Sequence, residues 1–339
     1  MLCPVCNEEF CSKHFDKWWD PDEFDWNKSD RLAETCAEHF FTWWDPDRYD
    51  WYNASRELAK YCCGFFYVWW NPDKYNWETS SCSLARYCSE YFHTWWDPDK
   101  YDWRMSSSSL ATYCSEYFDL WWDPNRFNWK EGSWALAQHC FRYFHKWWDP
   151  DKFDWEFASN FLVRYCSEYF DVWWNPNKFG WQQGSYGLAT FCSDKFRIWW
   201  NADKFEWQDA SGYLARYCQR YFPTWWNPDK FDWSCSWLLA KYCYDYFTMW
   251  WDSDKYNWRD GSVELAVFCS DYFNIWWDPN RFNWRDASWA LARYCAKWFH
   301  KWWDPKKYVV KHVRMLDQFC SEYKHIWERD LKLVHLLGV

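Results

Sequence analysis

The chain has 339 residues, of which 40 are tryptophan and only 8 are glycine, and its formal net charge is −10. This composition excludes collagen-like and flexible low-complexity chains, and the negative charge is unfavourable for a protein that binds nucleic-acid phosphates. No apolar run is long enough to cross a bilayer and the first residues lack a secretory signal, so we expect a cytoplasmic protein with reduced thiols and with neither a nucleic-acid nor a membrane partner.

Residues 1–28 are an incomplete copy of the unit that fills most of the chain, and they are expected to form a cap. Cys3, Cys6, Cys11 and His14 follow the spacing C-x2-C-x4-C-x2-H, which offers four zinc ligands close together. Cys11 also has the register of a cysteine that recurs in every later copy, so a second interpretation assigns it to packing. The sequence therefore leaves open a structural zinc site that closes this end, and it indicates no other cofactor.

Residues 29–308 are a tandem array. Trp-Trp pairs recur at steps of 26 residues, with two steps of 25, within the consensus S-x-x-L-A-x-Y-C-x-x-Y-F-x-x-W-W-D-P-D-K-F-D-W. A period this regular is typical of stacked repeats, in which each copy buries its apolar side against the next. The pattern predicts an all-α protein, a right- or left-handed α-solenoid of about 12 repeats. It resembles tetratricopeptide and Sel1-like arrays only in being a stack of short helical repeats, because its period and its Trp-Trp-Asp-Pro signature match neither family.

One copy, from Ser133 to Trp155, illustrates the expected elements. Ser133 precedes apolar residues at helical spacing, so we expect it to be the N-cap of a helix that ends before Pro150. Asp149 is expected to cap a second, short helical turn. Pro223 interrupts the same run in a later copy, which indicates either a kink or two short helices, and favours the second. Each repeat is therefore expected to hold two or three short helices.

The recurring positions predict packing rather than chemistry. A buried tryptophan hides roughly 150–250 Å², and much of that area is available only against a neighbouring copy, so a single repeat is not expected to fold. The recurring cysteines are about one helix diameter apart, roughly 10 Å, which is too far for a disulfide. In the illustrated copy the structural residues are Trp147, Trp148, Trp155, Cys140, Ser133 and Asp149.

The positions that differ between copies are the candidates for binding. They follow the recurring serine or precede the Trp pair by two residues. Such variation indicates either a ligand that is read along the stack or a solvated surface without constraint, and one sequence leaves both open. The candidates are Trp134, Tyr186, Tyr213, Trp237, Trp289, His93, His145 and His300.

Residues 309–339 diverge from the consensus and are expected to form a capping helix. Leu316, Cys320 and Trp327 keep the register, whereas Asp317 replaces the usual alanine. The leucine-rich end is expected to cover the last repeat, or to dock a partner or a second copy of the chain.

The sequence contains no phosphate-binding glycine loop, no G-x-S-x-G and no H-E-x-x-H, so we do not expect an enzyme. The favoured function is a non-enzymatic scaffold that binds a protein or peptide along its surface. One alternative is a carbohydrate-binding aromatic surface, which requires an evenly spaced row of exposed repeat tryptophans. The other is a purely structural, self-assembling rod.

Overall fold

The computed structural model describes residues 2–337. Within this range the chain forms α-helices and three-residue 3-10 helices, without a β-strand beyond an isolated bridge between Leu2 and Glu9. Consecutive helices pack side by side, which confirms the predicted α-solenoid of about 12 repeats. The chain divides into two compact units, Met1–Gly180 and Trp181–Val339, and each is described on its own.

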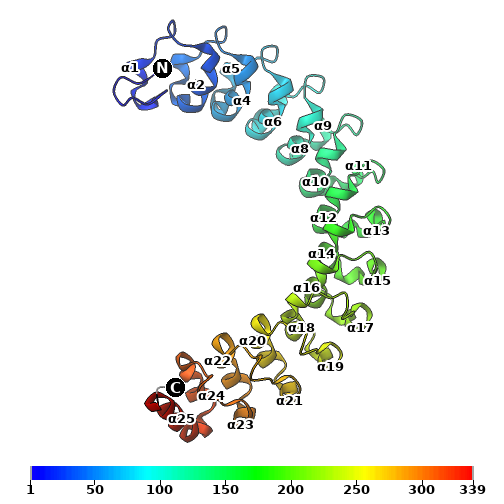
Figure 1. Ribbon diagram of the computed structural model, residues 1–339. Helices are drawn as coiled ribbons and strands as arrows, with labels where there is room; N and C mark the ends of the chain where they lie inside the picture. The colour runs from blue at the N-terminus through cyan, green and yellow to red at the C-terminus, as the bar shows by residue number, and fades with distance from the viewer. Residues whose placement is uncertain (1, 338–339) are drawn as a thin grey trace. The chain divides into compact units, whose positions relative to one another are not determined.

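Each repeat contains a long helix, a 3-10 helix, a short helix and a turn. Within each unit the long helices lie next to one another in one layer and the short helices in a second layer (Figure 1). The long helices are α2 (Ser29–Thr35), α4 (Trp51–Tyr61), α6 (Trp77–Tyr87), α8 (Trp103–Tyr113), α10 (Trp129–His139) and α12 (Trp155–Tyr165) in the first unit, and α14 (Trp181–Phe191), α16 (Trp207–Tyr217), α18 (Trp237–Tyr242), α20 (Trp258–Phe268), α22 (Trp284–Tyr294) and α24 (Val313–Phe319) in the second.

The short helices have four residues each and begin at a phenylalanine. They are α1 (Phe15–Trp18), α3 (Phe40–Trp43), α5 (Phe66–Trp69), α7 (Phe92–Trp95), α9 (Phe118–Trp121), α11 (Phe144–Trp147) and α13 (Phe170–Trp173) in the first unit, and α15 (Phe196–Trp199), α17 (Phe222–Trp225), α19 (Phe247–Trp250), α21 (Phe273–Trp276) and α23 (Phe299–Trp302) in the second. A final helix, α25 (Lys324–Leu337), ends the described chain.

The long helix begins one turn earlier than the sequence predicted. In α10 the side chain of Asn128 is the N-cap and accepts a hydrogen bond from the backbone N–H of Glu131. Ser133 is therefore not an N-cap, because it lies inside the helix, where it is 1% exposed. Its hydroxyl donates to the carbonyl of Trp129 at 2.6 Å. The prediction was wrong because asparagine and aspartate cap helices as well as serine does, and Asn128 stands first.

Two helices, rather than one kinked helix, lie between the third tryptophan of one repeat and the Trp pair of the next. Helix α10 ends at His139, a 3-10 helix covers Phe141–Tyr143, and α11 begins at Phe144. In the copy that contains Pro223, this proline is the second residue of α17. A proline at the start of a helix costs no hydrogen bond, because the N–H group there has no intrahelical partner. The prediction of two short helices is confirmed.

The Asp-Pro-Asp segment after each Trp pair forms a turn. The Asp149 side chain accepts hydrogen bonds from the backbone N–H groups of Asp151 at 3.0 Å and Lys152 at 3.3 Å. Residues 150–152 are a hydrogen-bonded turn and not a helix. Asp149 thus caps a turn, as aspartate does through its own side chain, and the predicted second helix at this point is wrong.

The first tryptophan of each pair lies in the core. Trp147 is 1% exposed and its indole N–H donates to the carbonyl of Cys140 at 2.9 Å. Trp148 is half-buried, and Trp155 is 9% exposed with its N–H bonded to the carbonyl of Pro150 at 2.9 Å. None of the tryptophans among the described residues is an exposed side chain. The recurring indoles therefore lie inside or at the edge of the packed layers.

Three contacts join the repeat of Ser133 to its neighbours. The backbone N–H of Asp154 donates to the hydroxyl oxygen of Ser133 at 3.0 Å, across 21 residues. The thiol of Cys140 donates to the carbonyl of Ala111 in the preceding repeat at 3.5 Å. The ring of Phe144 stacks on Tyr169 of the following repeat with centroids 4.5 Å apart. Residues that are buried within one repeat thus also contact the adjacent repeats and stabilise the stack.

Three long helices, α2, α18 and α24, are shorter than the others, and in α2 and α18 the missing residue lies between the third tryptophan and the serine of the repeat. In these copies the third tryptophan stands three residues before the serine, at Trp26 and Ser29 and again at Trp233 and Ser236, whereas four residues separate Trp129 from Ser133. Each shortened copy starts with a 3-10 helix, Trp26–Lys28 or Trp233–Cys235, and its α-helix begins later. The tighter 3-10 winding absorbs the missing residue.

The chain end is a continuous helix. Trp327 on α25 is 4% exposed and keeps the bond of its indole to the carbonyl of Cys320, at 3.2 Å. Asp330 accepts from the indole N–H of Trp303 at 3.0 Å. The predicted boundaries of the terminal caps, residues 1–28 and 309–339, stay a prediction. Among the described residues no helix combines the length and the apolar character needed to cross a membrane.

Candidate functional site

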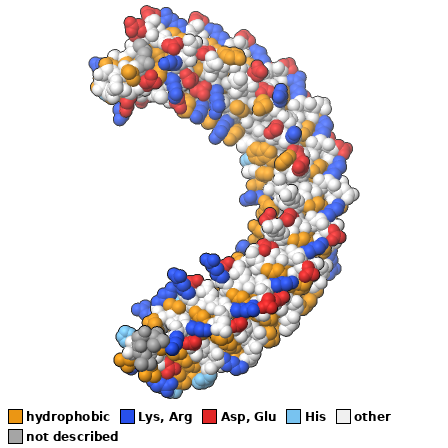
Figure 2. Space-filling view, in the orientation of Figure 1, with side chains coloured by type: hydrophobic (Ala, Val, Ile, Leu, Met, Phe, Trp, Pro, Cys, Tyr) orange, Lys and Arg blue, Asp and Glu red, His pale blue; other side chains and the backbone are white. Residues whose placement is uncertain are grey.

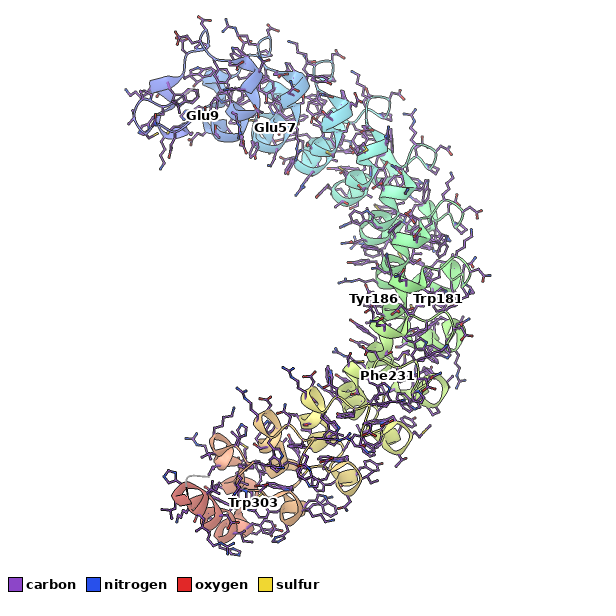
Figure 3. The ribbon with its side chains drawn as sticks, in the orientation of Figure 1. Glu9, Glu57, Trp181, Tyr186, Phe231 and Trp303 are labelled. Carbon is purple, nitrogen blue, oxygen red and sulfur yellow. The ribbon has the colours of Figure 1, made fainter. Side chains whose placement is uncertain are left out.

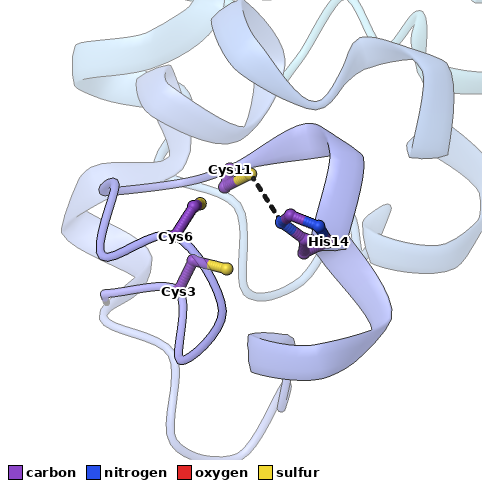
Figure 4. A group of neighbouring side chains, drawn as sticks. All are labelled: Cys3, Cys6, Cys11 and His14. Atoms are coloured by element: carbon purple, nitrogen blue, oxygen red, sulfur yellow. Dashed lines mark hydrogen bonds between the residues drawn. The ribbon is translucent and has the colours of Figure 1, made fainter.

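The four predicted zinc ligands come together near the start of the first unit (Figure 4). One ligand atom from each of Cys3, Cys6, Cys11 and His14 lies within 4.8 Å of the others. Cys11 Sγ and His14 Nδ1 are 3.4 Å apart. A tetrahedral zinc ion with Zn–S bonds of about 2.3 Å separates its sulfur ligands by about 3.8 Å. The group therefore needs to contract by at most about 1 Å (4.8 Å less 3.8 Å) to surround a zinc ion.

A tight loop positions these side chains. The backbone N–H of Cys3 donates to the carbonyl of Glu8, and the N–H of Asn7 to the carbonyl of Cys3, both at 2.9 Å. Asn7 has a φ of 61° and Phe10 a φ of 52°. Asparagine adopts this left-handed conformation readily, whereas phenylalanine rarely does. Phe10 is 6% exposed, so its burial holds the unusual backbone that delivers Cys11 to the group.

Backbone N–H groups favour a thiolate in this loop. Burial raises the pKa of the Cys3 thiol, but hydrogen bonds from the N–H groups of Cys6 and Val5, together with those from the thiols of Cys6 and Cys11, outweigh burial, so this pKa is lowered. The N–H of Glu8 acts in the same direction on Cys6, yet burial and the neighbouring thiols raise the pKa of Cys6 to about 12. A metal ion bound here would supply positive charge and so favour the thiolate forms of Cys3 and Cys6.

A second candidate site is the long-helix face, which we define as the surface of the long helices that points away from the short helices. Figure 3 labels Tyr186 on this side of α14 and Trp181 on the other. Neighbouring repeats bring rings together here: Trp134 lies 5.8 Å from Phe161, and Tyr186 lies 5.6 Å from Tyr213. These variable residues therefore make aromatic clusters that span two repeats.

The tryptophans of the long-helix face are half-buried rather than free. The indole N–H groups of Trp134 and Trp289 donate to the carbonyls of Glu131 at 2.9 Å and Asp286 at 3.0 Å, within their own helices. Because the polar edge of each ring is satisfied in this way, the part that reaches the surface is apolar. These side chains offer flat apolar contacts.

A cavity of about 250 Å³ lies between α16 and α18. Trp237 and Tyr213, both predicted as binding residues, line it together with Arg216 and Leu238. It lies beside the late start of α18, one of the shortened long helices. Residues at the start of this shortened repeat, Asp232 and Cys235, help to line it.

The predicted histidines lie in the other layer. His93, His145 and His300 are exposed residues of the short helices α7, α11 and α23. His145 packs edge-on against Tyr169 of the next repeat, with centroids 5.0 Å apart. The structure therefore separates these histidines from the aromatic residues of the long-helix face, and they do not form a common site with them.

The cations of the repeats form two groups, which the sequence did not distinguish. On the turn edge, the lysine of Asp-Pro-Asp-Lys pairs with an aspartate of the preceding repeat, as in Lys100 with Asp73 at 2.8 Å and Lys230 with Asp203 at 2.9 Å. Arg216 on the long-helix face instead lies over the ring of Tyr217, 5.1 Å from its centroid. The sequence feature that could have indicated this second group is a basic residue directly before the recurring tyrosine.

No protein-family model matches the chain, and comparison with curated proteins and with solved structures gives no match.

Proposed function

We propose that the chain is a non-enzymatic repeat scaffold that binds a protein or peptide along its long-helix face. The observation that carries the proposal is the division between recurring and varying positions. Recurring residues are buried, as Trp147, Cys140 and Ser133 are at 1%, 0% and 1% exposure. Varying residues such as Trp134 and Tyr213 reach the surface. A varied surface on a constant support is how repeat proteins bind extended partners.

The two alternatives have unequal support. Carbohydrate binding requires an exposed row of repeat tryptophans, whereas Trp147 and its equivalents are 1–6% exposed.

Self-assembly through the C-terminal segment is favoured by Leu333 and Leu336 on α25, which are 48% and 79% exposed. If this segment joins two chains, Leu336→Glu lowers the mass measured by sedimentation equilibrium to that of one chain. A mass of one chain before the substitution contradicts self-assembly.

The N-terminal group supports a second function, a structural zinc site that closes the first repeat. Three cysteines and one histidine are a common ligand set for structural zinc, which is four-coordinate and closed to substrate. Phe10, held in the same loop, packs on Trp18 and Phe24 with centroids 5.9 and 6.2 Å away. A zinc ion there would fix the loop that covers the first aromatic cluster.

Selection of phage-displayed random peptides on the immobilised chain tests the scaffold proposal. Selected peptides are expected to lose about tenfold or more in affinity for the variant Trp237→Ala/Trp289→Ala, since aromatic anchors dominate such interfaces. The matched control is Ile198→Ala/Ile275→Ala, which alters two short-helix residues that are each 57% exposed and should keep binding. Selection of no peptide, or equal binding to both variants, contradicts the proposal.

A further inference from the structure

Four arginines occupy the same position on the long-helix face, five residues after the buried serine of their repeats. They are Arg86 and Arg164 in the first unit and Arg216 and Arg293 in the second, and all four are exposed. The guanidinium carbon of each lies 5.1–5.3 Å from the centroid of the ring that follows it in sequence. We call them the ladder arginines. Lysine holds this position in two further repeats.

Rings of the adjacent repeat approach the same guanidinium groups. Arg86 lies 5.7 Å from the ring of Tyr113, Arg216 lies 5.9 Å from Tyr242, and Arg293 lies 5.5 Å from Phe319. A guanidinium that rests on rings loses little further freedom when it binds a ligand, and its N–H edge stays open for a bidentate bond to a carboxylate. The ladder arginines are therefore ordered in advance for an anion.

The ladder arginines have no acidic partner in the described part of the chain. No carboxylate oxygen lies within 4.0 Å of Arg86, Arg164, Arg216 or Arg293 there, whereas Lys74 on the turn edge contacts Asp47 at 2.7 Å. Figure 2 shows Lys and Arg side chains along the long-helix edge of both units. In a chain with a net charge of −10, positive groups left unpaired on one face point to a negatively charged partner.

We propose that the long-helix face of each unit binds an extended, acidic segment of a partner protein, with carboxylates of the segment on the ladder arginines of that unit. This inference rests on the proposed scaffold function and names the chemistry of its partner. Adjacent long helices are about 10 Å apart, which is about the length of three residues of extended chain. A segment with an acidic residue at every third position therefore presents one carboxylate to each long helix. The two ladder arginines of each unit are three repeats apart, so they meet every third of these carboxylates.

A peptide fits this surface better than a nucleic acid does. Exposed acidic residues follow two of the ladder arginines by four positions, Glu90 after Arg86 and Glu168 after Arg164. A polynucleotide carries a phosphate at every step and would meet these carboxylates. A peptide can place neutral residues opposite them and keep its acidic residues for the arginines. In the first unit this alternation of charge favours separated negative charges, whereas the basic residues Arg220 and Lys297 hold the corresponding positions in the second unit.

The probe is a fluorescein-labelled peptide of about 20 residues with glutamate at every third position and glycine or serine between, followed by fluorescence anisotropy with the full chain. Binding is expected to weaken at least tenfold between about 50 and about 300 mM salt, because exposed charges are screened. The variant Arg86→Gln/Arg216→Gln/Arg293→Gln is expected to lose about tenfold or more in affinity. Arg→Lys at the same three positions keeps the charge and should restore part of the loss.

The matched control is Lys74→Gln/Lys100→Gln/Lys230→Gln, which removes the same charge from the turn edge, where each lysine already pairs with an aspartate. This variant should bind the peptide within about twofold of the original chain, and urea unfolding of all variants shows whether they are folded. Equal loss in both variants, or no binding of the glutamate peptide, overturns the proposal. Tighter binding of a single-stranded oligonucleotide of similar length overturns it as well. If the peptides from random selection still bind through Trp237 and Trp289 in that case, the scaffold function stands without this partner class.

Discussion

The hydroxyl oxygen of Ser133 accepts a hydrogen bond from the backbone N–H of Asp154 at 3.0 Å, across the boundary between two repeats. Asp154 is the N-cap of α12, so this bond fixes the start of the next long helix. The same hydroxyl donates to the carbonyl of Trp129. One buried side chain thus links two helices, which explains why a small polar residue recurs in an otherwise apolar layer.

Ser133→Ala is expected to lower the free energy of unfolding by about 1–3 kcal/mol, because it leaves the N–H of Asp154 without its partner. Urea unfolding followed by circular dichroism measures the change. Ser108→Ala, at a half-exposed position of α8, is the control and should change the midpoint little. A loss at Ser133 no larger than at Ser108 would show that the bond between repeats does not stabilise the fold.

The buried cysteines predict a loss of stability in alkali. Burial raises the pKa of the Cys114 thiol from 9.0 to about 12, and burial has the same direction of effect at Cys62 and Cys88. Above pH 9 the unfolded chain releases these protons while the folded chain keeps them, so rising pH favours unfolding. Stability should be constant below about pH 8 and fall between about pH 9 and 12, by about 1.4 kcal/mol per pH unit for each thiol.

Urea midpoints of the reduced protein between pH 7 and pH 10 measure this dependence. Cys114→Ala should give a shallower decline above pH 9, since one proton fewer is released on unfolding. An identical decline in the variant would mean that the Cys114 thiol does not have the raised pKa that its burial implies.

The N-terminal group predicts one zinc ion per chain. Metal analysis of the chain expressed with zinc should find it, and Cys6→Ser should remove it together with part of the thermal stability, because metal binding and folding of such a loop are coupled. Cys6 is exposed, so the substitution costs little packing, and Cys63→Ser at a half-buried position outside the group is the control. A chain without zinc, or full zinc content in the Cys6 variant, would exclude the site.

Much of the fold could be predicted from the sequence because the period is exact over many copies. The spacing of Trp147, Cys140 and Ser133 within a repeat is enough to predict stacking and burial. The start of the long helix was misplaced because Asn128 and Ser133 are both N-cap residue types and Asn128 holds the cap. The bond of Ser133 to Asp154, 21 residues later, could not be predicted because no local preference reports that contact. The role of Cys140 was predicted as simple packing, whereas its thiol also donates to Ala111 in the preceding repeat.

The two candidate sites differ in how much of each could be predicted from the sequence. The spacing of Cys3, Cys6, Cys11 and His14 predicted a metal-binding group because all four ligands lie in one short segment, and the structure brings them together. The ladder arginines were not predicted, because their character depends on rings of the adjacent repeat and on the absence of a nearby carboxylate. Both are properties of the stack rather than of one copy.

The recurring tryptophans are interior residues, and we propose that binding takes place on the surface around them. Acrylamide quenching of tryptophan fluorescence tests this arrangement, since Trp121, Trp147 and Trp173 are each 1% exposed and bond their indole N–H to a backbone carbonyl. The folded chain should show blue-shifted emission and a quenching constant several-fold below that of the urea-unfolded chain. Equal quenching of the folded and unfolded chains would show that the indoles face water, and that they, rather than the surface around them, are available to a ligand.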